Sequence, residues 1–590
     1  MKELQYPFDC AYILKKKRSI KKALLSDGST RIKKKIAVLG GSTTGDIVSV
    51  LELFLLQYGI EPQFYESEYN AYWQDAMFGN EELDSFAPDI IILHTSNRNI
   101  TETLSMSMTK EEVSEALERQ YSHFEVMWEK LKEKFGCSII QNNFEMPLYR
   151  LLGNADTYDY RGMTNFISRL NMKLYEYAQS HDSFYINDIN YLSASYGLEK
   201  WSNPLYWYMY KYALCTDAIP YLSYSLSNII KSLLGKNKKM LALDLDNTLW
   251  GGIVGDDGVE NLQLGEETPV AQGYREFQQY VKKHKELGIM LSVCSKNDEE
   301  NAVAGLKHPD GWLSPDDFVS IKANWEPKDR NIVSIANEIN IMPDSIVFVD
   351  DNPAERAIVS AQVQGVAVPE IDSIENYIRT IDRSGFFEVT AFSEDDLKRN
   401  DMYIANAKRA QQQASFENYS DYLLSLEMQA TIGDFEPMYI ARITQLTNKS
   451  NQFNLTTKRY TQAQMQETFE SDEYIRLSGR LSDKFGDNGV VSVVIGKKQG
   501  EELHIELWLM SCRVLKRDME YAMLDRLVEE SRSCGINKLV GYYYPTAKNK
   551  MVKNLYSDFG FEKISEDEDG NAVFELPIEG YEKKCSVIKY

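Results

Sequence analysis

The sequence lacks the patterns that mark several common protein classes. Its 590 residues include seven scattered cysteines, none of which forms a CxxC pair: Cys10, Cys137, Cys215, Cys294, Cys512, Cys534 and Cys585. This odd-numbered set favours reduced thiols and gives no support for a zinc site. No apolar run approaches the length of a membrane span, and the N-terminus lacks the apolar core of a signal peptide. We therefore expect a soluble cytoplasmic protein.

Basic residues are too few to balance the acidic ones. The formal net charge of −23 argues against a general nucleic-acid binder, because phosphate backbones favour basic surfaces. The N-terminus is an exception, since residues 13–25, ILKKKRSIKKALL, and residues 31–36, RIKKKI, are locally basic. Such a stretch is either a solvated helix face with a linker or a docking surface for an acidic partner.

The chain is too long for one hydrophobic core, and we expect roughly three to four domains. Apolar strands alternate with helical segments to about residue 230, and the alternation restarts at Met240 after the polar stretch GKNKK. The fold class that we predict is α/β and multidomain. The predicted parts are a basic lead over 1–35, an α/β domain over 36–234, a second α/β domain with a parallel sheet over 235–384, a helical connector over 385–430 and an α+β domain over 431–590.

Polar residues stand where the predicted strands of the middle domain end. Two aspartates follow the first strand, a serine ends the second, a lysine precedes a helix, and an acidic pair ends the third. The residues are Asp244, Asp246, Thr248, Ser295, Lys328, Asp350 and Asp351. Because the carboxyl ends of parallel strands converge on the ligand crevice, we expect these side chains to share one small volume.

This set of side chains suits phosphoryl transfer. Crowded carboxylates stay ionised when a divalent cation offsets their repulsion, and oxygen-only ligands favour Mg²⁺. Ser295 can hydrogen-bond a phosphoryl oxygen, and Lys328 can supply compensating positive charge. One aspartate can then act as nucleophile and another as acid/base for the leaving group.

The order Asp-x-Asp-x-Thr, Ser, Lys, Asp-Asp resembles the haloacid dehalogenase (HAD) phosphohydrolase superfamily. The resemblance implies that Asp244 is the nucleophile and that Asp246 is the general acid/base, which also offers its backbone carbonyl to Mg²⁺. It implies Thr248, Ser295 and Lys328 as phosphate-binding residues. The implied metal ligands are Asp244, Asp246, Asp350 and Asp351, and Asp351 aligns better than Asp350 with the family's metal-ligating acid. The short stretch between the first two motif elements leaves no room for a large cap domain.

The first domain resembles the SGNH hydrolases. Its motif IAVLGGSTT places Ser42 in a glycine turn after a strand, like the nucleophile of that family. The family's histidine is expected after Asp188, but the sequence there, WSNPLYWYMYKYAL, contains none. We therefore expect an SGNH-like fold that is inactive as a hydrolase. A ligand site at Ser42 and Asn97 and a plain structural turn both remain open.

The last domain resembles the GNAT acyltransferases through IELWLMSCRVL, a helix from Asp518 and KNKMVKNLYSDFGFE. The turn at residues 513–518 departs from that family because it has no glycine for binding coenzyme A, although Arg513, Lys516 and Arg517 could attract a phosphate-bearing group. Cys512 precedes these cations. It is either a thiol activated by its neighbours or a small buried apolar residue.

The chain resembles the FkbH family over nearly its whole length. The resemblance rests on the order of the domains and on four motifs, DLDNTLWGG, FVDDNPAER, SNQFNLTTKRYT and SCRVL. The resemblance implies removal of phosphate from 1,3-bisphosphoglycerate and transfer of a glyceroyl group to an acyl carrier protein. It implies Cys512 as the transient acyl acceptor, with Asn451, Gln452, Asn454, Arg513 and Arg517 near the acyl or carrier group. Two alternatives are a plain small-molecule phosphatase with flanking binding domains and a non-catalytic carrier-docking protein. The intact acids argue against the latter.

Overall fold

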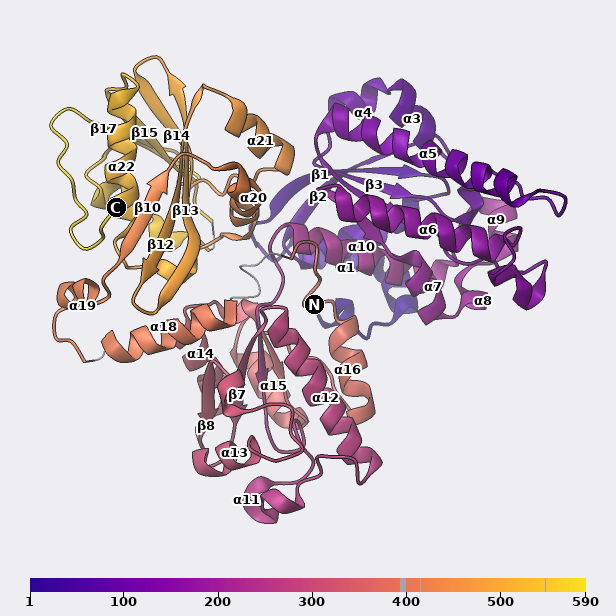
Figure 1. The fold of residues 1–590 in the computed structure, drawn as a ribbon, viewed down its shortest axis with the longest axis horizontal. Coiled ribbons are helices and arrows are strands. Elements are labelled where there is room, and N and C mark those ends of the chain that lie inside the picture. Colours follow the sequence, from indigo (N-terminus) through magenta and orange to yellow (C-terminus); the bar gives the residue numbers. More distant parts are fainter. Residues whose placement is uncertain (393–398, 414, 547) are drawn as a thin grey trace. The chain divides into compact units, whose positions relative to one another are not determined.

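The computed structural model describes residues 1–392, 399–413, 415–546 and 548–590 (Figure 1). They divide into two compact units. Unit 1 holds Met1–Leu233 and Thr461–Met465, and unit 2 holds Leu234–Tyr460 and Gln466–Tyr590. The connector expected over 385–430 falls partly outside the described residues. Within it, α18 (Arg399–Gln413) and α19 (Tyr419–Ser425) are helical.

Unit 1 is built on a five-stranded parallel sheet in the order β2-β1-β3-β4-β5. Its strands are β1 (Ile32–Gly40), β2 (Ile60–Glu66), β3 (Ile90–His94), β4 (Ser138–Asn142) and β5 (Phe184–Asn187). The helices α5 (Lys110–Phe135) and α6 (Met163–Ser180) cover one face, where Leu39, Leu93 and Trp128 share a core. Two further helices, α2 (Gly45–Gln57) and α10 (Ile219–Leu233), pack against each other. Burial on both faces explains why β3 is apolar along its length.

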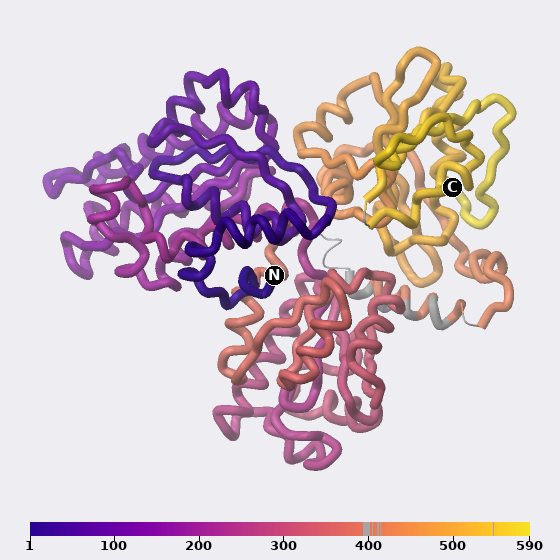
Figure 2. The backbone as a smooth tube through the Cα atoms, turned by 180° about the vertical axis from the view of Figure 1, so that it is seen from behind, coloured from indigo at the N-terminus to yellow at the C-terminus, as the bar shows by residue number. Residues whose placement is uncertain are grey.

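The basic lead predicted over 1–35 lies in unit 1 and includes α1 (Cys10–Leu25) (Figure 2). Asp9 caps this helix by accepting a hydrogen bond from the Tyr12 amide at 3.0 Å. Ile13, Ile20 and Leu24 are buried, and the helix packs against α2. Their helical spacing gives α1 an apolar stripe opposite Lys15 and Lys22.

The first part of unit 2 is a four-stranded parallel sheet in the order β8-β7-β6-β9. Its strands are β6 (Met240–Leu243), β7 (Met290–Ser295), β8 (Ser320–Ala323) and β9 (Ile346–Val349). One face packs against α12 (Pro269–Glu286) and α16 (Ile374–Arg383), and the other against α14 (Lys328–Ile339) and α15 (Pro353–Gln362). The predicted α/β, multidomain fold class is therefore confirmed.

The segment between β6 and α12 is short. It forms one turn of helix, α11 (Val254–Asp257), and a 3-10 turn at Val259–Asn261. Gly252 has φ 102°, in the region that favours glycine, and its amide donates to Asn247 Oδ1 at 3.0 Å. The chain therefore folds back tightly over the ends of the strands, without a cap domain in this segment.

The last part of unit 2 is a mixed sheet in the order β10-β12-β13-β14-β15-β17-β16. The strands are β10 (Gln429–Gly433), β12 (Tyr474–Asp483), β13 (Gly486–Gln499), β14 (Glu502–Met510), β15 (Lys538–Tyr543), β16 (Glu562–Glu566) and β17 (Ala572–Pro577). All neighbours are antiparallel except β14 and β15. The helix α22 (Met519–Ser533) packs on β12 and β13. None of the described helices combines the length and apolar character needed to cross a membrane.

Candidate functional site

The ends of two paired strands bring the first acidic residues together. In the register of β6 and β9, Leu243 lies opposite Val349, and Asp244 and Asp350 follow directly. The Asp244 amide donates to the Val349 carbonyl at 2.9 Å, which holds the two chains in this register beyond the strands. Two carboxylates predicted from separate parts of the sequence therefore leave the same edge of the sheet.

Lys328, the first residue of α14, lies between these carboxylates. Its Nζ is 2.7 Å from Asp244 Oδ2 and 2.6 Å from Asp350 Oδ2, and its side chain is buried. Burial alone would lower the pKa of Lys328, but the charges of Asp244 and Asp350 outweigh it and raise that pKa. The ammonium therefore stays charged and offsets part of the repulsion between the two acids.

Asp244, Asp350 and Asp351 can each place a carboxylate oxygen within 4.8 Å of the others. Asp244 Oδ1 is buried and, within the described structure, accepts no hydrogen bond. Burial, followed by the charge of Asp244, raises the pKa of Asp350 to about 6 and also raises the pKa of Asp351. An unsatisfied oxygen among crowded carboxylates is a donor set that fits Mg²⁺.

The carboxylate of Asp246 lies outside this cluster of three acids. Its Oδ1 accepts hydrogen bonds from Trp250 Nε1 at 2.9 Å and the Val254 amide at 3.0 Å, and its Oδ2 accepts one from Asn297 Nδ2 at 2.9 Å. The loop after β6 turns this carboxylate toward these donors, so the metal role predicted for Asp246, through its backbone carbonyl, does not involve the carboxylate. Burial raises the pKa of Asp246, as suits an acid/base group.

The remaining predicted residues of this site lie close to the acidic cluster. Thr248 is buried and its Oγ1 accepts a hydrogen bond from the Asp351 amide at 3.2 Å, so Thr248 holds the acidic turn in place. Ser295 ends β7, next to β6, and is buried. Arg356 was missed by the sequence reasoning. Its Nη1 donates to the Asp350 carbonyl at 2.8 Å and to the Asp351 carbonyl at 2.7 Å.

Asn297 was also missed, although a signal was present. It lies two residues after Ser295, in SKND, so a polar residue at the same strand end was visible in the sequence. In the structure it is buried and bonds Asp246. Arg356 had a similar signal in NPAER, just inside the helix that follows the acidic pair.

The residues predicted around Cys512 in the C-terminal domain differ from one another in exposure. Cys512 is partly exposed in the turn after β14, whereas Arg513 and Arg517 are buried. Arg517 donates to Asp483 Oδ2 at 3.2 Å and to Asn406 Oδ1 at 2.6 Å. The expectation that Arg517 faces a phosphate-bearing group therefore does not agree with the structure, because buried partners already use its guanidinium.

The polar residues at 451–454 stabilise their own loop. Asn451 Oδ1 accepts a hydrogen bond from Arg459, and Asn454 Oδ1 accepts one from the Thr457 amide at 2.8 Å. Asn454 is completely buried, while Gln452 is half-buried. These contacts favour a turn-forming role for Asn451 and Asn454 over direct contact with an acyl or carrier group.

In unit 1, Ser42 shows no link to a base. Its Oγ is buried and has no hydrogen-bond partner among the described atoms. Asp188 accepts a hydrogen bond from Asn143 Nδ2 at 2.6 Å and caps the helix that follows it. The Asn97 amide donates to Glu145 Oε2 at 3.2 Å. Glu145 was not predicted. Its carboxyl group is buried, and burial raises its pKa to about 7.

The buried Glu145 predicts how the stability of the chain depends on pH. Because the folded-state pKa lies above the unfolded value, this residue stabilises the fold fully below about pH 4.5, and that contribution is lost as pH rises through 7. Glu145→Gln keeps an acceptor for Asn97 but cannot ionise. As pH rises from 4.5 to 8, the free energy of unfolding of the variant should therefore increase by about 3 kcal/mol relative to that of the natural chain. Urea unfolding at both pH values measures this difference, and a difference that does not change with pH would contradict the burial argument.

Comparison with known proteins gives a family. Residues 35–231 match the family model described as FkbH, N-terminal domain. A solved structure from Bacteroides fragilis is described as the N-terminal part of the protein BF1531, containing a phosphatase domain complexed with Mg. It is 31% identical, covers 64% of this chain and 99% of its own, and has a TM-score of 0.60. No curated protein matches.

Two acetyltransferase structures match a smaller part of the chain. The ribosomal-protein-S18-alanine N-acetyltransferase from Escherichia coli is 16% identical over 25% of this chain and 94% of its own, with a TM-score of 0.21. A GNAT-family acetyltransferase from Streptococcus pneumoniae is 15% identical over 25% of this chain and 99% of its own, with a TM-score of 0.20. These scores are too low to support an assignment, and the family match does not name an SGNH domain, so both resemblances stay predictions. The match to the Bacteroides protein shows that the chain belongs to the same family as that protein, and its residues 35–231 form an FkbH N-terminal domain.

Proposed function

We propose that this chain is a Mg²⁺-dependent phosphatase or phosphotransferase of the HAD type. The observation that carries the proposal is the buried, unsatisfied Asp244 Oδ1 in a cluster with Lys328, Asp350 and Asp351. The description of the Bacteroides relative as a phosphatase domain complexed with Mg supports the same chemistry. Asp244, Asp350 and Asp351 would hold the ion, which supplies charge that offsets the negative phosphate.

The residues of the chain have separate roles in the proposed reaction. The Asp244 carboxylate forms a bond to phosphorus while the bond from phosphorus to the leaving oxygen breaks, giving an aspartyl-phosphate. Lys328 holds Asp244 Oδ2, which fixes the orientation of the carboxylate. Asp246 gives a proton to the leaving oxygen and then takes one from the water that releases phosphate. Asn297 holds the Asp246 carboxylate in place during both steps.

The substrate that we propose is a small acyl phosphate like 1,3-bisphosphoglycerate. Such a molecule offers a phosphate ester to Asp244 and, at its other end, an activated carbonyl to a thiolate. In the second reaction, the Cys512 thiolate forms a thioester bond to the carbonyl carbon while the bond from that carbon to the phosphate oxygen breaks, and inorganic phosphate leaves. Exchange with the thiol of an acyl carrier protein then moves the glyceroyl group and restores Cys512. Its partial exposure supports this role.

Cys512→Ala tests the acyl-transfer part. The variant should keep Mg²⁺-dependent phosphate release within about twofold, because Cys512 is not part of the acidic cluster, and should lose thioester formation on the carrier by about 10³-fold or more. Intact mass of a phosphopantetheinylated carrier, after mixing with Mg²⁺ and 1,3-bisphosphoglycerate, measures the adduct. Cys534→Ala, at an exposed thiol, is the matched control. Carrier loading by the Cys512 variant would show that the thiol role is wrong.

A second candidate is a plain small-molecule phosphatase whose other domains bind ligands. It is favoured by the burial of Arg513 and Arg517, because these two guanidinium groups are not exposed beside Cys512, where the acyl-transfer role would use them. The same mass experiment separates the candidates, because a plain phosphatase releases phosphate and leaves both proteins without a glyceroyl adduct.

A further inference from the structure

The outward face of α1 is a basic stripe on an acidic protein. Successive helical residues are about 100° apart, so Lys15, Arg18 and Lys22 fall within roughly 60° of one another around the helix. All three are exposed, and they lie opposite the buried Ile13 and Ile20. We use the name basic stripe for Lys15, Arg18 and Lys22.

Two neighbouring lysines of α1, Lys17 and Lys21, are neutralised by acidic partners, whereas the cations of the stripe are not. Lys17 Nζ lies 2.5 Å from Asp46 Oδ1, and Lys21 Nζ lies 2.7 Å from Glu52 Oε2, both on α2. No acidic side chain in the described ranges pairs with Lys15, Arg18 or Lys22. The structure therefore separates cations that attach α1 to unit 1 from cations that face solvent, which the sequence alone did not separate.

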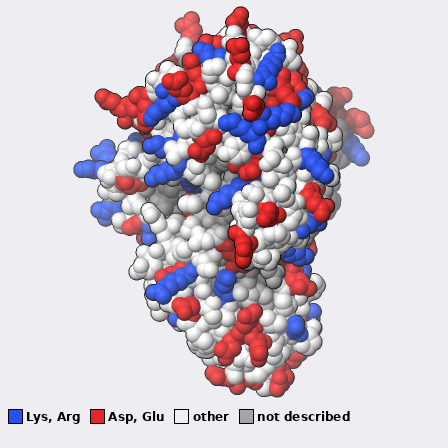
Figure 3. Space-filling model, turned by 90° about the vertical axis from the view of Figure 1, so that its left-hand side faces the viewer, with Lys and Arg blue, Asp and Glu red and all other residues white. Residues whose placement is uncertain are grey.

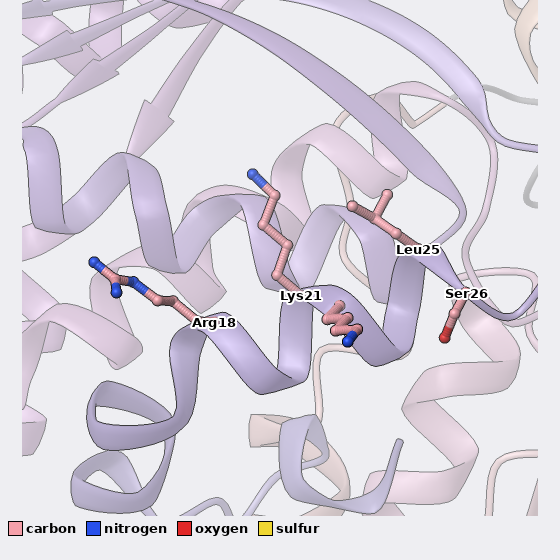
Figure 4. Close-up of a pocket in the computed structure, with 5 residues that line it drawn as sticks. Arg18, Lys21, Leu25 and Ser26 are labelled. Atoms are coloured by element: carbon pink, nitrogen blue, oxygen red, sulfur yellow. The ribbon is translucent and has the colours of Figure 1, made fainter.

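The surface beside the stripe also has an apolar component. Arg18, Lys21, Lys22, Leu25 and Ser26 line a shallow hollow, and Figure 4 shows their side chains fanning out from the helix. Leu25 is 48% exposed, and Tyr12 is 41% exposed toward the other end of α1. Exposed apolar groups around a charged stripe are typical of a surface that contacts another protein.

The charge of the rest of the chain narrows the choice of partner. With a net charge of −23, most of the surface repels an acidic molecule, and Figure 3 shows a face on which acidic side chains gather at one end. Three cations along one helix cover about 10 Å, which matches a turn or two of an acidic helix better than a nucleic-acid backbone or a membrane. Charge complementarity would then direct an acidic protein to α1 and away from other surfaces.

We propose that the basic stripe is the docking surface for an acidic helix of the acyl carrier protein. This inference rests on the proposed function, which supplies the carrier. The stripe contributes to encounter and orientation of the carrier, while phosphate release from a small substrate takes place without it. Because rim charges act through long-range attraction, binding should weaken as salt increases.

The experiment compares Lys15→Glu/Arg18→Glu/Lys22→Glu with a matched control, Lys110→Glu/Lys130→Glu/Lys200→Glu. Both triple variants change the net charge equally at exposed positions of unit 1. The probe is a labelled, phosphopantetheinylated acyl carrier protein of negative net charge, whose Kd is measured by fluorescence anisotropy at about 0.05 M and about 0.5 M salt. The stripe variant should raise Kd roughly tenfold at low salt and the control less than about twofold. Lys15→Gln/Arg18→Gln/Lys22→Gln should give an intermediate Kd.

The other outcomes separate this inference from the proposed function. Unchanged phosphate release in the stripe variant, with weaker carrier binding and slower loading, supports docking. Equal carrier binding by both triple variants, or no carrier binding by the natural chain, overturns it. Tighter binding of duplex DNA or anionic vesicles than of the carrier, lost in the stripe variant, also overturns it. If the carrier binds through the stripe but no thioester forms on it, the docking inference stands and the acyl-transfer part of the proposed function is wrong.

Discussion

Asp244→Asn should lower Mg²⁺-dependent phosphate release by about 10⁴-fold, because an amide oxygen is a poor nucleophile toward phosphorus. The fold should be retained. The charge of Asp244 is one cause of the raised pKa of Asp350, so its removal relieves repulsion in the cluster. Lys328 would still pair with Asp350 at 2.6 Å. Release of inorganic phosphate measures the activity, and thermal unfolding measures the stability.

Glu300→Gln is the matched control for this experiment, since it removes an exposed carboxylate of the same domain. It should leave phosphate release within about twofold of the natural chain. Full activity in the Asp244 variant would mean that another group attacks phosphorus, and the assignment of the nucleophile would be wrong.

Lys328→Met should damage both activity and stability. The variant keeps a long apolar stem but leaves two buried carboxylates facing each other without their shared cation. Removing one partner of a buried ion pair costs about 3–5 kcal/mol, and loss of a preorganised charge at the phosphate lowers the rate by about 10³-fold. Urea unfolding and phosphate release measure the two effects.

The stability loss in the Lys328 variant should depend on pH. The pKa of Asp350 is already raised to about 6, and without the ammonium it rises further, so protonation removes the repulsion as pH falls. The deficit should therefore be smallest below about pH 6 and grow as pH rises above it. Lys307→Met, at an exposed lysine of the same domain, should show neither effect. A deficit that does not vary with pH would contradict the electrostatic account of the cluster.

The acidic cluster could be located from the sequence because its signal is local. Asp244, Ser295 and Asp350 each end a short apolar run, and the carboxyl ends of parallel strands meet at one edge of a sheet. The strand β8 was missed because SIKA is short, with two half-buried residues, and so gives a weak pattern. The side-chain direction of Asp246 depends on Trp250 and Asn297, which approach from different segments, and no spacing rule predicts it.

The C-terminal domain shows the limit of reasoning from neighbours in sequence. Arg517 is close to Cys512 in the chain, which suggested a cationic environment for the thiol. Its buried partner, Asp483, comes from β12, far away in the sequence. Arg409 also pairs with Asp483 across a long stretch of sequence, and its Nη2 lies 2.6 Å from Asp483 Oδ1. A long-range ion pair of this kind leaves no mark on local spacing, so the burial of Arg517 could not be predicted.

The account depends most on Asp244 as the residue that accepts phosphate from the substrate. Trapping the phosphorylated enzyme tests this role directly. The full chain is mixed with Mg²⁺ and substrate carrying a ³²P-labelled phosphate ester, quenched in acid and digested, and the labelled peptide is identified. The account predicts a hydroxylamine-sensitive label on the peptide that contains Asp244, and no label in Asp244→Asn. Phosphate release without a labelled enzyme, or a label on a peptide that lacks Asp244, would contradict it.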